Sequence, residues 1–333
     1  MRLATVQTGG RELVAFEGPD GRLIDLAESW RVAGVEGEAP ATLLELVERG
    51  PGGLAGARAA AALDSVPEGS SWAPQEVRWL PPIRRPSKIV GVAINNSLMA
   101  AAAYRYFDEP AFFLKAPSSL IGHGAAVEVE VGYGLTHPEP ELACVIAKRS
   151  KGLSEDEALD SVFGYSIIND ITSPGLKDRD SLHLKIPAGI PGAESVSGWR
   201  ELRDEQDRDI FLTYHARSKG ADTFGPMGPW LTTSDEVDDP NNLRVQAWLG
   251  DDLATVDSTG ALRFTVQRVL SHLTRTMTLE PGDIVHFGTA ARPAKYTLRE
   301  MDITRLDGDL TIEIEGLGTL RNPVIRTESR SGG

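Results

Sequence analysis

The sequence contains a single cysteine, Cys144, among 333 residues. One cysteine cannot form a disulfide within the chain, and it excludes a zinc site built on several cysteines. No uninterrupted apolar run approaches the roughly 20 residues that a membrane-spanning helix needs. The first residues also lack the apolar core of a signal peptide. We therefore expect a cytoplasmic protein that does not interact with membranes.

Basic residues are few compared with acidic ones. Lysine and arginine total 34 against 48 aspartates and glutamates, which gives a formal net charge of −14. Proteins that bind nucleic acids normally present a basic surface, and no long run of lysine or arginine occurs here. The composition, with 41% hydrophobic residues, is that of an ordinary globular protein. These features exclude nucleic acid as the expected partner and favour a small-molecule substrate.

The N-terminal region is predicted to mix short strands with short helices. Residues 1–27 form strand-like runs separated by Gly-Gly and Pro-Asp-Gly turns. A helix is expected over 41–49, with Thr42 as its N-cap. The Gly-rich segment 50–56 follows that helix and is interpreted as a turn, and a further short helix is expected in 57–66. No residue in this region points to a chemical function, so we expect a structural role.

A segment rich in proline and serine, residues 66–87, predicts a domain boundary. Beyond it, strand-like runs outnumber helices and do not alternate with them regularly. Helical stretches are expected at 97–106, 154–161 and 264–276. This pattern favours an α+β fold with a β-rich core over a doubly wound sheet. The predicted parts are a small N-terminal α+β domain at 1–78, a catalytic domain at 79–325 and a flexible tail at 326–333.

Three carboxylates stand beside apolar runs in the second part. Glu139 and Glu141 are two residues apart, so an extended backbone places both on one face. Asp170 follows another apolar run. Oxygen ligands without cysteine or histidine favour Mg²⁺, Mn²⁺ or Ca²⁺. Taken alone, however, the same spacing is also common on the solvent-facing side of a strand.

Several motifs in a fixed order strengthen the interpretation that these carboxylates form a metal site. They are KIVGVAINN at 88–96, FFLKAP at 112–117, HPEPEL at 137–142, IND at 168–170, KGADTFGPMGPW at 219–230 and LEPGDIVHFGT at 279–289. Together they resemble the fumarylacetoacetate hydrolase family over about residues 86–325. The resemblance implies a β-rich mixed-sheet core, a homodimer, and Mg²⁺ or Mn²⁺ (with Ca²⁺ possible in crystals) held by Glu139, Glu141 and Asp170.

The resemblance also implies the chemistry. It points to a 2-oxo or 2,4-dioxo acid as substrate and to cleavage of a carbon–carbon bond by water through a metal-stabilised enolate. Lys219 would be the catalytic residue, either as a cation beside developing negative charge or as a proton carrier. Gly288 and Thr289 would bind a substrate carboxylate. Lys115 would screen substrate charge or support the site, and Lys177 would contact substrate.

The sequence departs from the family pattern at three places. The histidine and glutamate that activate water in hydrolytic members are replaced by Met99 and Ala102. After Asp170, Pro174 and Lys177 occupy positions where the family usually carries arginine and glutamine. The spacer that includes 178–215 is longer than in compact members, and it forms either a functional loop or a plain surface elaboration.

These departures leave three functions open. The first is hydrolysis of an acylpyruvate-type acid, with another residue activating water. The second is a lyase or isomerase on the same substrate class: a decarboxylase, a hydratase or dehydratase, or a tautomerase. The third is a non-catalytic protein that binds the metal or ligand. Replacements for the lost pair are sought among Tyr104, Tyr106, Glu109, His123, His183 and His215.

Overall fold

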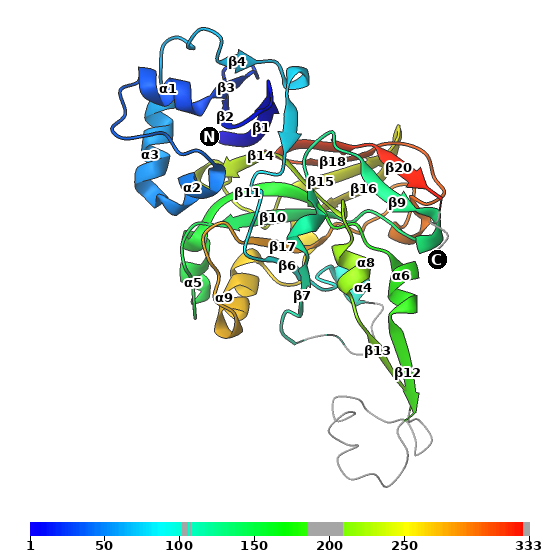
Figure 1. Ribbon diagram of the computed structural model, residues 1–333. Coiled ribbons are helices and arrows are strands. Elements are labelled where there is room, and N and C mark those ends of the chain that lie inside the picture. The colour runs from blue at the N-terminus through cyan, green and yellow to red at the C-terminus, as the bar shows by residue number, and fades with distance from the viewer. Residues whose placement is uncertain (102–105, 107, 186–208, 329–333) are drawn as a thin grey trace.

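The computed structural model describes residues 1–101, 106, 108–185 and 209–328 (Figure 1). Its strands are β1 Arg2–Thr8, β2 Arg11–Glu17, β3 Leu23–Asp25, β4 Ser71–Trp72, β5 Arg78–Leu80, β6 Ile89–Val92, β7 Phe112–Lys115, β8 Leu120–Ile121, β9 Val127–Glu130, β10 Pro140–Ile146, β11 Val162–Asn169, β12 Ser181–Lys185, β13 Asp209–Thr213, β14 Gly225–Thr233, β15 Arg244–Leu249, β16 Asp252–Ser258, β17 Ile284–Thr289, β18 Leu310–Ile314, β19 Gly318–Asn322 and β20 Val324–Thr327. Its α-helices are α1 Leu26–Val32, α2 Leu43–Glu48, α3 Gly50–Ala61, α4 Ser97–Ala100, α5 Glu155–Ala158, α6 Pro174–Arg179, α8 Ala216–Gly220 and α9 Val266–Thr276.

A large mixed sheet runs through the whole molecule. Its strands follow the order β4-β3-β2-β1-β14-β11-β10-β17-β6-β7, with β5 and β8 pairing at its sides. The N-terminal meander joins this sheet through β1, which pairs antiparallel with β14 so that Arg2 lies opposite Thr232. The region predicted as a structural domain therefore shares its sheet with the rest of the chain. The exact division into domains stays a prediction.

The sheet has a layer on each face. On one face Ala143 and Val145 of β10 pack with residues of helices α1, α2 and α3. On the other face Cys144 and its neighbours pack against α9 and the four-stranded sheet β16-β15-β18-β19. All seven residues of β10 are buried because alternate side chains enter these two cores. The strand-rich α+β class predicted from the sequence is confirmed.

Helices α2 and α9 occur where the sequence predicts them, and the Thr42 side chain accepts a hydrogen bond from the Glu45 amide as the N-cap of α2. The turn predicted for 50–56 is wrong, because these residues begin α3. Gly56 gives the reason: a Cβ there would lie 2.2 Å from the Trp30 ring. Close packing on α1 therefore outweighs the low helix propensity of glycine.

The chain between α6 and α8 leaves the body of the molecule as an antiparallel pair, β12 and β13 (Figure 1). Leu182 and Phe211 on this pair are exposed. The pair belongs to the spacer 178–215, whose remaining part at 186–208 lies outside the described residues. Of the helix expected at 97–106, α4 is described, while Ala102 and Tyr104 are not. Among the described helices, none is long and apolar enough to cross a membrane.

Candidate metal centre

The ends of two neighbouring strands bring the predicted carboxylates together. Antiparallel pairing places Pro140 of β10 opposite Asn169 of β11. Glu139 and Asp170 consequently meet at the ends of the strands, where the Asp170 amide donates to the Glu139 carbonyl oxygen at 2.9 Å. The Asn169 side chain accepts from the Glu139 amide at 2.9 Å and fixes the entry into β10. These hydrogen bonds fix the backbone at Glu139 and Asp170 to the ends of β10 and β11.

Two lysines enclose the Asp170 carboxylate. Lys219 of α8 donates from Nζ to Asp170 Oδ2 at 2.5 Å, to Glu139 Oε2 at 3.0 Å and to Thr172 Oγ1 at 2.6 Å. Lys115 at the end of β7 places its Nζ 2.7 Å from Asp170 Oδ1 and also donates to the carbonyl oxygen of Lys219. Asp170 is fully buried. We call Asp170, Lys115 and Lys219 the cationic half of the site.

These contacts shift the ionisation of all three groups. Burial opposes the charge on Asp170, but Lys115 and Lys219 outweigh burial and hold the pKa of this carboxyl well below its usual range. Burial also disfavours the charge on Lys219, yet Asp170, Glu139 and Glu141 raise the pKa of that ammonium. Burial dominates at Lys115 and lowers its pKa although Asp170 favours the charged form. Lys219 is therefore held as an ammonium ion, which donates protons in hydrogen bonds.

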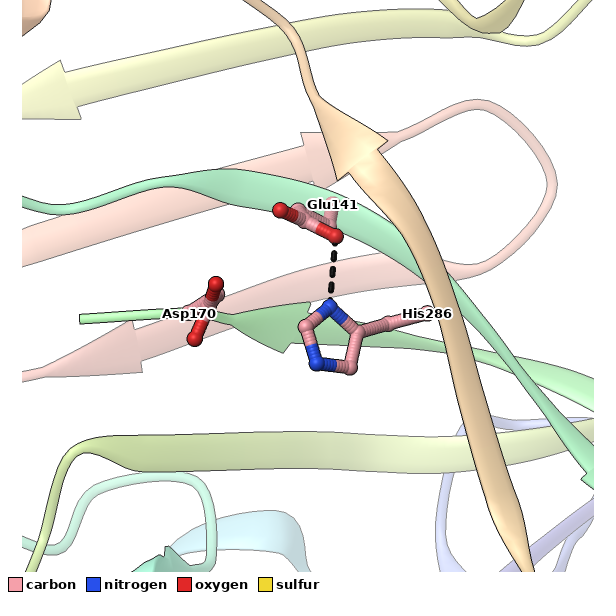
Figure 2. A group of neighbouring side chains, drawn as sticks. All are labelled: Glu141, Asp170 and His286. Atoms are coloured by element: carbon pink, nitrogen blue, oxygen red, sulfur yellow. Dashed lines mark hydrogen bonds and ion pairs between the residues drawn. The ribbon is translucent and has the colours of Figure 1, made fainter. Parts of the chain in front are cut away.

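Glu141 has different partners. Its Oε2 lies 2.6 Å from Nδ1 of His286 and accepts the Gly288 amide at 2.7 Å. Figure 2 shows the other carboxylate oxygen on the side away from the imidazole, toward Asp170. Burial raises the pKa of Glu141, and the nearby carboxylates add to this effect while His286 opposes it. We call Glu141, His286 and Gly288 the imidazole half of the site.

Glu141, Asp170 and His286 each offer one ligand atom, and these atoms lie within 4.8 Å of one another. The buried carboxylate oxygens of this group suit a divalent ion such as Mn²⁺. Glu139, predicted as the third ligand, lies beside this group with its Oε2 bonded to Lys219. The residues present are therefore compatible with a divalent ion, and the ligand role of each carboxylate stays a prediction.

The remaining predicted residues differ in position. Lys115 is buried and bonded inside the protein, and the Gly288 amide is bonded to Glu141. Thr289 is buried, with its hydroxyl donating to the Ala290 carbonyl. Lys177 is exposed on α6. Burial lowers the pKa of His215, and the positive charges of Lys177 and Lys219 lower it further. Substrate contacts by these residues stay predictions.

His286 was missed by reasoning from the sequence. Its signal was available, because an ionisable residue interrupts the apolar run Ile284 to Phe287 just before Gly288. Met99, which stands in place of the expected histidine, is half-buried and packs on an apolar cluster that includes Leu298 and Met301. His123 is one of the substitutes proposed for the missing water-activating pair. Its Nδ1 accepts a hydrogen bond from the Arg321 backbone amide.

Comparison with known proteins gives the family. Residues 88–325 match the family model described as fumarylacetoacetate (FAA) hydrolase, C-terminal. The match spans more than half of the sequence, and the chain belongs to the fumarylacetoacetate hydrolase family. A protein from Mycobacterium tuberculosis is 31% identical over 260 residues, which cover 78% of this chain and 82% of the relative.

Two solved structures extend the likeness to the whole fold. Fumarylacetoacetate hydrolase from Exiguobacterium antarcticum is 25% identical with a TM-score of 0.69, and the match covers 98% of this chain and 100% of that chain. Maleylpyruvate hydrolase from Sphingobium sp. SYK-6, in complex with manganese(II) and pyruvate, is 26% identical with a TM-score of 0.67. That match covers 98% of this chain and 99% of the other.

Proposed function

We propose that this protein is a divalent-metal-dependent enzyme that hydrolyses a carbon–carbon bond of an acylpyruvate-type 2,4-dioxo acid. The observation that carries the proposal is the burial of two carboxylates, Glu141 and Asp170, and two lysines at one end of the central strands, with the partly buried Glu139 beside them. Proteins rarely bury so many charges without a functional reason. The manganese and pyruvate in the related maleylpyruvate hydrolase support the same assignment.

The balance of charge in this group suits an acidic substrate. When all of these groups are charged, as a bound cation would favour, Glu139, Glu141 and Asp170 supply three negative charges and Lys115 and Lys219 supply two positive ones. A divalent cation turns this formal excess of one negative charge into an excess of one positive charge. A monoanionic oxo acid then neutralises the site. Opposite charge in a buried site stabilises the bound anion strongly.

Glu139, Glu141 and Asp170 would hold the ion, which supplies a Lewis acid for the substrate's ketone oxygen. Lys219 would donate a hydrogen bond to the oxygen on which negative charge develops, because its raised pKa keeps it protonated. Lys115 would fix Asp170 and the carbonyl of Lys219, and so orient α8. In hydrolysis, water adds to the C4 carbonyl, the C3–C4 bond breaks, and C3 takes a proton.

A second candidate function is a lyase or isomerase on the same class of acid. The position of Met99 favours it, because this apolar side chain packs in a hydrophobic cluster where hydrolytic members carry the water-activating histidine. Decarboxylation, dehydration and tautomerisation need a polarised ketone and a proton carrier but no attacking water, whereas hydration adds water to a double bond that the polarised ketone activates. The same ligands and Lys219 would serve these reactions.

Proton NMR of 2,4-dioxopentanoate with the Mn²⁺- or Mg²⁺-loaded protein separates the two functions. Acetate and pyruvate in equal amounts would support hydrolysis. Loss of CO₂, or faster exchange of the C3 protons without acetate, would favour the lyase or isomerase. Chelator-treated protein and the Glu141→Gln variant are the controls. Equal turnover with and without chelator would overturn the metal-dependent proposal, and binding of the acid with no chemical change would favour a non-catalytic protein.

A further inference from the structure

The ring of His286 lies in a row of residues that crosses four strands. His286 of β17 pairs with Gly91 of β6, and Gly91 pairs with Phe113 of β7. On its other side His286 lies opposite Ala143 of β10, two residues after Glu141. The imidazole is fully buried and meets the Phe113 ring edge-on, with centroids 5.5 Å apart. The sheet therefore fixes where this ring can lie.

Gly91 provides the space for this ring. A Cβ at position 91 would lie 2.4 Å from Cε1 and 2.6 Å from Nε2 of His286, and 2.3 Å from the Phe113 ring. Any side chain at this position would displace the imidazole or the phenyl ring. The position of the His286 ring, between Glu141 and β6, therefore depends on the absence of a side chain at position 91.

The two nitrogens of His286 have unequal surroundings. Nδ1 faces the Glu141 carboxylate, which only accepts hydrogen bonds when ionised, and in that state Nδ1 is the donor of the contact. Nε2 is buried over Gly91 and has no hydrogen-bond partner among the described residues. A buried polar atom without a partner costs stability. The contact with Glu141 is the interaction that offsets this cost.

Both donors to Glu141 act on the same oxygen. The His286 imidazole and the Gly288 amide each bind Oε2, which leaves Oε1 for another partner on the side toward Asp170 (Figure 2). We propose that His286 is a positioning residue for the metal centre, which locks the Glu141 carboxylate so that Oε1 serves as the ligand. This inference rests on the proposed metal site. It assigns Nδ1 to orientation, and no nitrogen to the ion itself.

The experiment measures Mn²⁺ binding to the full chain by calorimetry and by electron paramagnetic resonance. His286→Leu removes the donor to Oε2, and loss of a hydrogen bond that orients a ligand typically weakens metal binding by about 10- to 100-fold. His286→Asn places an amide nitrogen near the position of Nδ1 and should recover most of the affinity. His286→Gln, whose polar atoms lie near the position of Nε2, should not recover it.

Nitrogen coupling in the pulsed spectrum of bound Mn²⁺ adds a readout that a structural role alone would not change. We expect no directly coordinated histidine nitrogen in the native protein. Such a coupling, lost in His286→Leu, would overturn the positioning role and make His286 a ligand. Native affinity in a folded His286→Leu variant would also overturn it. If the native protein binds no Mn²⁺, the metal site itself fails, which is a distinct result.

Discussion

Asp170 and Glu141 lie close together at the ends of neighbouring strands, yet Asp170 is held by two lysines whereas Glu141 is held by an imidazole and a backbone amide. Lys115 and Lys219 lower the pKa of Asp170, whereas burial raises the pKa of Glu141 despite its contact with His286. The cationic half can keep its carboxylate ionised without an added ion. The imidazole half would gain most from a bound ion, because among the described residues no ion pair joins Glu141 to a lysine. The difference teaches that the two carboxylates would depend unequally on a bound metal ion.

Asp170→Asn should have the largest effect on stability. The change removes the negative charge with which the buried Lys115 and Lys219 pair. Removing one partner of a buried ion pair typically costs about 3–5 kcal/mol. The free energy of unfolding in urea, measured on chelator-treated protein, checks this. A loss below about 1 kcal/mol would contradict the view that the cationic half is stabilised without metal.

Glu141→Gln should affect metal binding far more than stability. The amide oxygen of glutamine can still accept hydrogen bonds from His286 and Gly288, so we expect a loss of stability within about 1 kcal/mol without metal. Removing the charged ligand should weaken Mn²⁺ binding by more than about 100-fold, beyond the effect expected for an orienting group. Calorimetry with Mn²⁺ measures it. Equal stability losses in this variant and in Asp170→Asn would remove the distinction between the halves.

Gly56→Ala tests whether the site depends on its own contacts or on general stability. The added Cβ would meet the Trp30 ring at 2.2 Å, and overpacking of this kind costs about 1–3 kcal/mol. The Mn²⁺ affinity of the folded variant should stay native, because α1 and α3 contribute no group to either half. Thermal unfolding together with Mn²⁺ titration checks both expectations. A large loss of affinity would show that the halves are coupled to the N-terminal layer.

The smallest expected effect concerns His123, which lies outside both halves. Burial and the charge of Arg321 lower the pKa of His123 in the folded protein. The unfolded chain then binds more protons below about pH 6.5, so His123 contributes a loss of stability as the pH falls through this range. His123→Asn should flatten the dependence of the unfolding free energy between about pH 5 and pH 7. An unchanged slope would contradict this assignment.

The sequence contained enough to predict the family, the α+β class and the meeting of Glu139 and Asp170, because these follow from ordered motifs and strand ends. His286 was not predicted, since its role depends on register between β17 and β10, which includes an irregularity between Glu141 and Ala143. The helix α3 was missed for a similar reason. Its glycines signal a turn locally, and only the contact with Trp30 shows why a helix forms.

The central position of β10 has a consequence for motion. This strand is buried along its whole length and is hydrogen-bonded on both sides, to β11 and β17. Its amide hydrogens should exchange with solvent only when the whole domain unfolds. Glu141, which we propose as a metal ligand, is therefore anchored in the part of the molecule expected to exchange slowest. Any adjustment to different substrates would have to come from segments such as α6, β12 and β13, which lie outside the central sheet.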